Sequence, residues 1–446
     1  MDQRSRWRRT SACHLFLICA ARAISSEAQT FNVLATFNGA NGSSPQSYGS
    51  SLVQGVFSLQ VTCAPPQPFT TLAEFDGTYG NNIQSTGASL VQGPDGNFYG
   101  TAASGGANLA GTVFKITPAG ALTALYSFVS SSPDGSRPLG GLALGSDGNF
   151  YATTSIDGAN GQGTVFQITP AGVLTTLYTF GSSPGDGSTA NSLIQAADGN
   201  FYGTTLGGGA NNKGTVFQVT PAGALTTLYS FSGLDGANPS ATLLQATDGY
   251  LYGTTQNGGP FNGGTVFRVG LDGTLNTVYM FKGLNGEGSS PQGALIQGSD
   301  GNFYGTTVGG DSVFGTVFQL TPDGTLTTLY RFCAQIGCPD GGYPYAGLLE
   351  ASDGNFYGTT STDGPNGAGT VFQITPGGAL TTLYGFRGPD GQVPWGALVE
   401  GSNGIIYGTT QFGGRISSAG TVFSFGISAC GNVAPSSVPS IRAVNR

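Results

Sequence analysis

The sequence DGNFYGTT stands at Asp198–Thr205, again at Asp300–Thr307 and again at Asp353–Thr360. Four near-copies begin at Asp95, Asp147, Asp248 and Asn403, so the seven copies start 50 to 53 residues apart. Each copy is followed by a second motif, Gly-Thr-Val-Phe, which begins at Gly111, Gly163, Gly214, Gly264, Gly315, Gly369 and Gly420. Two motifs that recur in the same order at a constant spacing indicate a tandem array of seven structural units.

A single repeat is predicted to contain four short strands. In one unit these are Ser192–Ala196, Asn200–Thr205, Gly214–Thr220 and Leu225–Phe231, and Asp198-Gly199 is a tight-turn pair between the first two. No segment of the unit shows helical periodicity. Four antiparallel strands in about fifty residues, repeated around a chain, are typical of a propeller blade. The sequence therefore predicts an all-β fold, a seven-bladed β-propeller of four-stranded antiparallel blades.

The octet has an architectural interpretation at each position. Phe201 and Tyr202 point to opposite faces of their strand, which suits a blade that is covered by a neighbour on both sides. Gly203 is a small residue inside a strand and suggests close approach of the neighbouring backbone. The alternative is a ring of Asp ligands for calcium. It is less favoured because calcium loops place several oxygen ligands close together, whereas each turn here offers one Asp.

The seventh copy lacks a fourth strand after Gly420–Gly426, and a matching strand, Phe69–Phe75, precedes the first copy. We therefore predict that Phe69–Phe75 closes the ring and leaves no open sheet edge. Residues 29–62 contain pieces that resemble strands, Thr30–Phe37, Ser50–Gly55 and Val56–Thr62, but no DGNFYGTT. They are an N-terminal extension of seven blades or, alternatively, part of an eighth blade.

The first 28 residues have the features of an export signal. Four Arg precede the apolar run Ala12–Ala21, and Ser26-Glu27-Ala28 offers a cleavage site. The expected domains are a signal peptide (1–28), an extension (29–68), the propeller (69–426) and a polar tail (427–446). No later stretch is a transmembrane candidate, so we predict an exported protein that is periplasmic, on the cell surface or extracellular.

Cysteine positions agree with an exported chain. The four Cys after the signal allow three connectivities. Cys63 lies just before the closing N-terminal strand and Cys430 just after the last C-terminal strand, so we predict that these two pair with each other. Cys333 and Cys338 would form the second disulfide, which an oxidising compartment permits.

Composition excludes several classes of function. Without its first 28 residues the chain keeps 10 of its 15 Lys and Arg and 21 of its 23 Asp and Glu, so binding to nucleic acid is not expected. The one His, His14, lies in the signal, which removes His-based triads and His-ligated metals from the rest of the chain. The Gly-rich links are not followed by helices and are not phosphate loops. We predict no cofactor and no bound metal.

The pairing of Gly163–Pro170 (GTVFQITP) with DGNFYGTT resembles the GloVer-type tandem repeat found in exported bacterial proteins. The resemblance covers about residues 69–426, and both motifs recur in order. It implies a secreted or surface repeat protein and carries no established activity with it. The Asp-Gly-Asn turn is also similar to turns in NHL-type propeller repeats, which bears on the fold alone.

Departures from the repeat mark the candidate binding residues. The links between fourth and first strands and between second and third strands should lie on one face of the disc, and most consist of Gly, Ser and Asn. Copies five to seven instead carry Phe314, Tyr343, Tyr345, Trp395, Phe412, Asp340, Asp390, Arg387 and Arg415. Rings with polar tips suit the faces of sugars, so we predict a glycan-binding face here. The alternative is that these rings only pack the links.

Two carboxylates break another repeat position. The first strand usually ends in Gln, but two consecutive copies have Glu350 and Glu400 there, near the expected central channel. These Glu either replace Gln as hydrogen-bond acceptors, which we favour, or form a carboxylate pair for glycoside hydrolysis or polysaccharide cleavage.

Three functional classes follow. The first is a monomeric binding or scaffold module, with an extracellular glycan or surface protein as partner. The second is a structural or adhesive surface protein, and the third is a carboxylate-based glycosidase or lyase.

Overall fold

The computed structural model describes residues 68–81, 83, 90–310 and 314–427. The chain divides into two units, Met1–Ala64 and Pro65–Arg446, and every described residue belongs to the second. All regular secondary structure in these residues is β-strand. Within the same ranges, no helix is long and apolar enough to cross a membrane.

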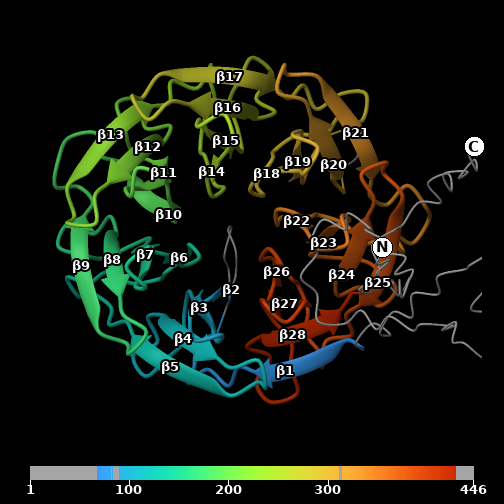
Figure 1. Cartoon of the computed structure of the whole chain (residues 1–446), viewed down its shortest axis with the longest axis horizontal. Coiled ribbons are helices and arrows are strands. Elements are labelled where there is room, and N and C mark those ends of the chain that lie inside the picture. The colour runs from blue at the N-terminus through green and yellow to red at the C-terminus, as the bar shows by residue number, and fades with distance from the viewer. Residues whose placement is uncertain (1–67, 82, 84–89, 311–313, 428–446) are drawn as a thin grey trace, which may run out of the picture. The chain divides into compact units, whose positions relative to one another are not determined.

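The strands form seven four-stranded sheets, which we number as blades in chain order (Figure 1). Blade 1 contains β2 (Leu90–Gln92), β3 (Phe98–Ala102), β4 (Thr112–Ile116) and β5 (Leu122–Ser127). Blade 2 contains β6 (Ala143–Leu144), β7 (Phe150–Thr154), β8 (Thr164–Ile168) and β9 (Leu174–Thr179). Blade 3 contains β10 (Ser188–Gln195), β11 (Phe201–Gly207), β12 (Thr215–Val219) and β13 (Leu225–Ser230). Blade 4 contains β14 (Leu244–Gln245), β15 (Leu251–Thr255), β16 (Thr265–Val269) and β17 (Leu275–Met280).

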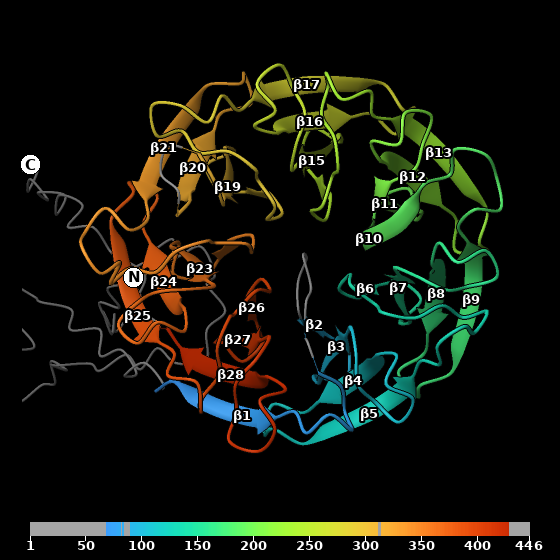
Figure 2. The same cartoon turned by 180° about the vertical axis from the view of Figure 1, so that it is seen from behind.

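Blade 5 contains β18 (Ile296–Gln297), β19 (Phe303–Thr307), β20 (Thr316–Leu320) and β21 (Leu326–Arg331). Blade 6 contains β22 (Leu349–Glu350), β23 (Phe356–Thr360), β24 (Thr370–Ile374) and β25 (Leu380–Gly385). Blade 7 contains β26 (Val399–Glu400), β27 (Ile405–Thr410), β28 (Thr421–Gly426) and the N-terminal strand β1 (Thr70–Glu74). Every strand pair is antiparallel, and the first strand of each blade lies innermost around the ring (Figures 1 and 2). The predicted seven-bladed propeller is confirmed.

Ring closure occurs where the sequence predicts it. In blade 7 the order is β1-β28-β27-β26, and Thr70 pairs with Ser424 while Glu74 pairs with Thr421. Blade 7 also packs on blade 1, because the rings of Tyr407 and Phe98 lie 4.2 Å apart. The described residues therefore close a ring of seven blades. Residues 29–62, which an eighth blade would require, lie outside the described residues.

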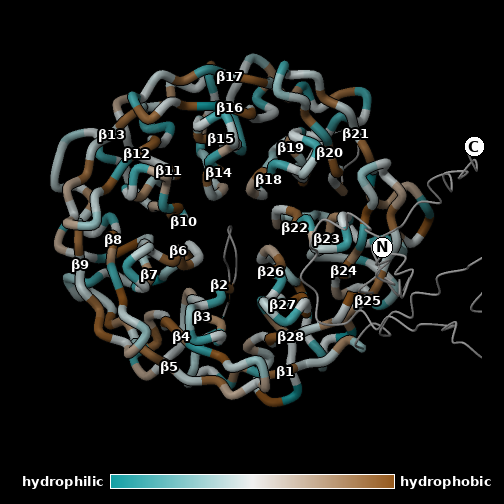
Figure 3. The backbone as a smooth tube through the Cα atoms, viewed as in Figure 1, coloured by the Kyte–Doolittle hydropathy of each residue, from teal (hydrophilic) through white to brown (hydrophobic). Residues whose placement is uncertain are grey.

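The second strand of each blade is buried on both faces, as the sequence indicated. Tyr151 of blade 2 packs on Phe201 of blade 3 with ring centroids 3.9 Å apart, and Tyr252 packs on Phe303 of the next blade at 4.2 Å. Figure 3 shows that hydrophobic segments recur in every blade around the ring. Stacked pairs of this kind add about 0.5–1.5 kcal/mol each beyond burial of their area.

The small residue after this aromatic pair has a different cause from the predicted one. A Cβ on Gly203 would lie 2.8 Å from the side chains of both Leu193 and Phe217. These belong to the first and third strands of the same blade, so the close neighbour is not the backbone of another blade. Position 203 is a glycine because the ring of Phe217 occupies the space that a side chain at this position would fill.

The Asp of the octet holds the hairpin together. Asp198 Oδ1 accepts the backbone N–H of Asn200 at 3.0 Å, and Oδ2 accepts the Asn200 amide at 2.9 Å and the Tyr202 hydroxyl at 2.7 Å. Gly199 between them has φ +83°, a conformation in which other residues are strained. In blade 7, Asn403 replaces the Asp and donates its amide to the Tyr407 hydroxyl at 2.8 Å. The octet therefore encodes a turn and an inter-blade contact.

Candidate functional site

The two kinds of link meet on one face of the propeller, which we call the link face. Tyr343, in the link from blade 5 to blade 6, donates its N–H to the carbonyl of Phe314 at 2.8 Å, and its own carbonyl accepts from Ser361 at 3.1 Å. Phe314 and Ser361 lie in the second-to-third strand links of blades 5 and 6. Tyr343 makes both bonds in a left-handed conformation, φ +55°, and the same conformation recurs at Arg137, Thr189, Asn238, Ser290 and Val393.

Four of the predicted aromatic residues form one continuous row on this face. Trp395 and Tyr345 occupy equivalent positions in blades 7 and 6, and their ring centroids lie 4.7 Å apart at 41°. Tyr345 lies 6.4 Å from Tyr343 with nearly parallel rings, and Tyr343 lies 5.6 Å from Phe314. All four side chains are partly exposed. We call Phe314, Tyr343, Tyr345 and Trp395 the aromatic row.

The other predicted ring and both arginines lie at the edge of blade 7. Phe412 is 40 % exposed, and among the described residues no ring contact joins it to the aromatic row. Gly414 donates its N–H to the carbonyl of Gly388 at 2.9 Å, so the neighbouring residues Arg387 and Arg415 belong to two links that are hydrogen-bonded to each other. Both arginines are exposed.

Asp340 and Asp390 are engaged by the scaffold. Tyr330 donates its hydroxyl to Asp340 Oδ2 at 2.9 Å, and the backbone N–H of Cys333 donates to the same oxygen at 3.0 Å. Burial, together with the hydrogen bond and charge of Asp340, raises the pKa of Tyr330 to about 12. Tyr384 donates to Asp390 in the same way. Equivalent pairs are Tyr126–Asp134, Tyr178–Asp186, Tyr229–Asp235 and Tyr279–Glu287.

Glu350 and Glu400 each bind the preceding blade. The backbone N–H and hydroxyl of Ser299 donate to the Glu350 carboxylate at 2.9 and 2.6 Å, and the N–H of Ser352 donates to Glu400 at 2.8 Å. Gln195, Gln245, Gln297 and Gln92 accept the corresponding N–H groups in other blades. These contacts support the interpretation that Glu replaces Gln as a hydrogen-bond acceptor.

The boundary between blades 1 and 2 lacks this hydrogen bond from a backbone N–H to a Gln or Glu side chain, and the sequence explains its absence. Blade 1 has Pro94 at the donor position, and proline has no N–H. The equivalent acceptor position of blade 2 is Leu144, an apolar residue. The repeat therefore loses donor and acceptor together, which avoids an unsatisfied polar group.

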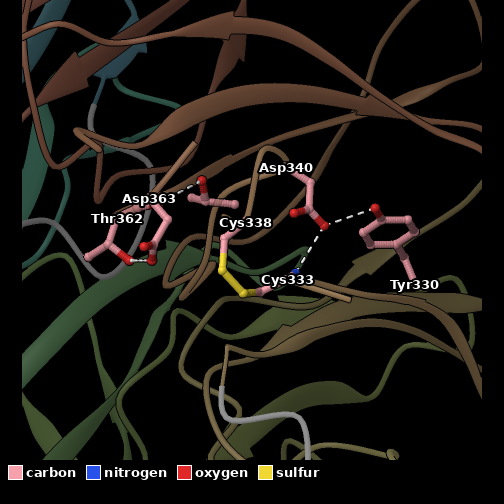
Figure 4. The surroundings of a disulfide bond; sticks show 7 residues. Tyr330, Cys333, Cys338, Asp340, Thr362 and Asp363 are labelled. Atoms are coloured by element: carbon pink, nitrogen blue, oxygen red, sulfur yellow. Dashed lines mark hydrogen bonds between the residues drawn. A yellow bond between two sulfur atoms is a disulfide. The ribbon is translucent and has the colours of Figure 1, made fainter. Parts of the chain in front are cut away.

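The predicted Cys333–Cys338 disulfide is present in the link that carries Tyr343 and Tyr345 (Figure 4). The carbonyl of Cys338 accepts N–H groups from Gly341 and Gly364 at 3.0 and 2.9 Å. The disulfide therefore closes a loop that is already attached to the neighbouring link. The predicted Cys63–Cys430 pair lies outside the described residues.

We predict that replacing both Cys333 and Cys338 with Ser lowers the free energy of unfolding by about 2 kcal/mol, the chain-entropy value for so short a loop. Denaturant unfolding of the variant and the wild type measures this difference. The aromatic row should keep its geometry, because the backbone bonds of Tyr343 do not depend on the disulfide. A decrease in the free energy of unfolding as large as the roughly 3–5 kcal/mol for truncation of a buried Phe would contradict this account.

The sequence did not indicate a polar hollow between the links of blades 2 and 3. Its volume is about 360 Å³, and its lining includes Gln162, Ser182, Ser183 and Asp186. The Asp186 carboxylate already accepts the hydroxyl of Tyr178 and the N–H of Ser183. Consecutive Gly and Ser residues in this link were the signal that could have indicated a hollow there.

The geometry defines a seven-bladed propeller with a row of aromatic residues on its link face, at positions where the repeat usually has Gly, Ser or Asn. Its sequence matches the Gloeobacter/Verrucomicrobia repeat over residues 54–194, 183–348 and 334–432. The chain belongs to this repeat family. A search of curated proteins found no match.

Solved structures that align with this chain at a TM-score of 0.50 or above share its fold. A streptogramin B lyase aligns with a TM-score of 0.55 and 14 % identity over 81 % of this chain and 97 % of that one. The extracellular domain of a hybrid two-component system from B. thetaiotaomicron aligns with a TM-score of 0.50 and 11 % identity over 77 % of this chain and 40 % of that one. A gluconolactonase from Xanthomonas campestris aligns with a lower TM-score of 0.41 and 14 % identity over 64 % of this chain and 85 % of that one. At these identities the likeness concerns the fold alone.

Proposed function

We propose that this protein is an exported binding module and that the link face of blades 5 to 7 binds an extracellular glycan. The observation that carries the proposal is the contact of Tyr345 with Trp395 across two blades, with both rings partly exposed. Equivalent positions in other blades are Leu139, Ser240 and Gln292. Neighbouring aromatic rings are therefore a local departure from the repeat.

The side-chain chemistry of the aromatic row suits a sugar ligand. A pyranose presents an apolar face of C–H groups and a rim of hydroxyls, and it matches partly exposed rings with polar tips. Burial, followed by repulsion from an ionised Tyr343, raises the pKa of Tyr345. A tyrosine hydroxyl is protonated at neutral pH even without this shift, so that of Tyr345 is able to donate. The blades hold the rings on bonded links, which lowers the conformational entropy lost on binding.

The charged residues have a secondary role in this proposal. Arg387 and Arg415 could hydrogen-bond hydroxyls at the edge of blade 7, beside Phe412. Asp340 and Asp390 each bind a tyrosine hydroxyl, so their contribution is to position the links. Glu350 and Glu400 are held by Ser299 and Ser352, and this arrangement favours binding over a carboxylate-pair mechanism.

The test replaces Trp395 and Tyr345 together with Ala. A glycan array and then calorimetry on the best ligand should show at least about a tenfold loss of affinity, because aromatic anchors dominate such interfaces. Phe261→Ala is the matched control, since Phe261 is an exposed ring in the second-to-third strand link of blade 4 and lies outside the row. Unchanged affinity in the double variant, at an unchanged melting temperature, would place the site elsewhere.

A further inference from the structure

The polar hollow between the links of blades 2 and 3 lies where the repeat loses a hydrogen bond. In five blades, one glycine of the second-to-third strand link donates its N–H to a carbonyl of the link that enters the blade. These pairs, at 2.8 to 3.1 Å, are Gly106–Gly77, Gly158–Ser132, Gly259–Gly233, Gly364–Cys338 and Gly414–Gly388. The equivalent residue of blade 3 is Gly209, and among the described residues no acceptor binds its N–H. Gly209 lines the hollow instead. The equivalent residue of blade 5, Asp311, lies outside the described residues.

A turn displaced by one residue explains the missing bond. In the link into blade 2, Ser132 accepts the N–H of Gly135, three residues on, and the same carbonyl accepts the N–H of Gly158. The links into blades 6 and 7 repeat this arrangement at Cys338–Gly341 and Gly388–Gly391. In the link into blade 3, by contrast, it is Asp186 that donates its N–H, to the carbonyl of Ser183 at 3.3 Å.

The sequence of this link accounts for the displacement. Pro184 stands second in the turn, and Gly185, with φ +83°, stands third, which is the pattern of a type II turn. Pro184 is three residues before Gly187, the position at which the other links place their acceptor carbonyl. It therefore lies inside the turn, and the carbonyl that Gly209 would need is not supplied.

We propose that the polar hollow is a second binding site, which takes one small, uncharged, polyhydroxylated molecule such as a single sugar unit. Its volume of about 360 Å³ is at the lower end of the roughly 300–1,000 Å³ that is usual for ligand sites. A backbone N–H without a protein partner is satisfied by water in the free protein, and a ligand hydroxyl can replace that water. The side-chain amide of Gln162, at the rim, forms no hydrogen bond among the described residues and provides both a donor and an acceptor.

The lining disfavours other classes of ligand. Pro184 is the one apolar side chain among the described residues that line the hollow, so it offers no platform for an apolar molecule. Asp186 is the one charged residue there, and its carboxylate repels an anion. The same carboxylate accepts the Tyr178 hydroxyl at 2.7 Å and the N–H groups of Gly181 and Ser183 at 3.1 Å, so it is a poor ligand for a cation.

This site differs from the aromatic row in place and in chemistry. The hollow lies between blades 2 and 3, whereas the row lies on blades 5 to 7, and binding here depends on hydrogen bonds without ring stacking. The inference therefore does not rest on glycan binding at the row, and each site can be removed without the other.

Calorimetry with glucose, galactose and mannose, each beside its own uronic acid, tests the ligand class. At least one neutral sugar should bind with one site per chain and a Kd of about 1 mM or lower. Its uronic acid should bind at least about tenfold more weakly, because its carboxylate meets Asp186. Failure of all three neutral sugars to bind overturns the proposal, and so does equal affinity for the charged form.

A double substitution removes the hollow without changing the length of the link. Pro184→Ser with Gly185→Pro makes residues 182–187 identical to Ser130–Gly135 of the preceding link. This variant should keep or raise the melting temperature, because it restores the acceptor for Gly209, and it should lose at least about tenfold in sugar affinity. Gln162→Ala leaves the link as it is and should weaken binding about threefold, the effect of one hydrogen bond. Unchanged affinity in both variants places the sugar elsewhere and overturns the proposal.

The control is Trp395→Ala with Tyr345→Ala, which should leave the affinity for the single sugar unchanged. A loss in this control, with none in the link variant, assigns the sugar to the aromatic row and overturns the present inference alone. Hydrogen exchange resolved to single residues gives an independent readout. The N–H of Gly209 should exchange faster than that of Gly158 in the free protein and slow down when the sugar is added. Equal protection of the two N–H groups in the free protein would refute the missing bond.

Discussion

A chain that lacks residues 29–75 should aggregate, whereas a chain that lacks only residues 29–62 should remain a soluble monomer. The difference between the two proteins is β1 with its flanking residues. β1 pairs with β28 from Thr70 to Glu74, and Phe75 continues the contact by donating its N–H to Gly420 at 3.0 Å. Without β1, the backbone of β28 becomes an exposed sheet edge, which is a template for pairing with other chains.

Loss of β1 also removes two anchoring rings. Phe75 is fully buried and packs against Phe114 of blade 1, while Phe69 stacks on Tyr384 with centroids 3.6 Å apart. Truncation of one buried Phe typically costs about 3–5 kcal/mol, a large part of the stability of a domain. Size-exclusion chromatography and light scattering at equal concentrations measure the outcome. Equal solubility of the two truncated proteins would count against closure by β1.

The parts of the fold that the sequence predicted are those encoded within a single repeat. The strand pattern and the Asp198-Gly199 turn depend on residues within one repeat, and repetition makes each signal visible seven times. The adjacent Phe201 and Tyr202 indicated burial on both faces of the strand, although Phe201 packs on Tyr151 of the neighbouring blade. Closure was predictable for a related reason, because Phe69–Phe75 matches the strand that the last repeat lacks. The disulfide between Cys333 and Cys338 needed only their proximity in sequence.

Contacts at variable spacing were missed. The tyrosine of the fourth strand binds a carboxylate in blades 1 to 6, but the separation is 6 residues for Tyr229–Asp235, 8 for Tyr126–Asp134 and 10 for Tyr330–Asp340. The changing interval hides the pair, so Asp340 was predicted as a ligand-binding residue without its scaffold role.

Contacts between blades were harder still to predict. The bond from Ser299 to Glu350 spans 51 residues, and its register depends on how the blades pack. The same applies to the aromatic row. The sequence placed Tyr345 and Trp395 in equivalent links of adjacent blades, whereas their ring contact follows from the angle between those blades.

The free energy of unfolding should fall steeply as the pH drops from about 5 to 3. Burial raises the pKa of Asp198, but hydrogen bonds from Tyr202 and Asn200 outweigh it and hold the pKa below its usual value. The turn carboxylates of Asp95, Asp147 and Asp300 show the same net direction. A folded-state pKa below the unfolded value means that the unfolded chain binds more protons in this range, so acid favours unfolding.

This acid effect can be separated from general charge effects. The chain carries a formal net charge of −8 at pH 7, so mild acid reduces repulsion within the folded protein and by itself would stabilise it. A decrease in stability must then come from carboxylates that are hydrogen-bonded in the fold.

Two substitutions in the octet test this role. The Asp198→Asn variant should be slightly less stable at pH 7, and its free energy of unfolding should decrease less between pH 5 and 3. The fold should tolerate this change because Asn403 supports the same turn in blade 7. Asn403→Asp, the reverse change, should make the decrease steeper. Urea unfolding at pH 7, 5, 4 and 3 measures all three proteins, and identical pH profiles would refute the role assigned to the octet carboxylates.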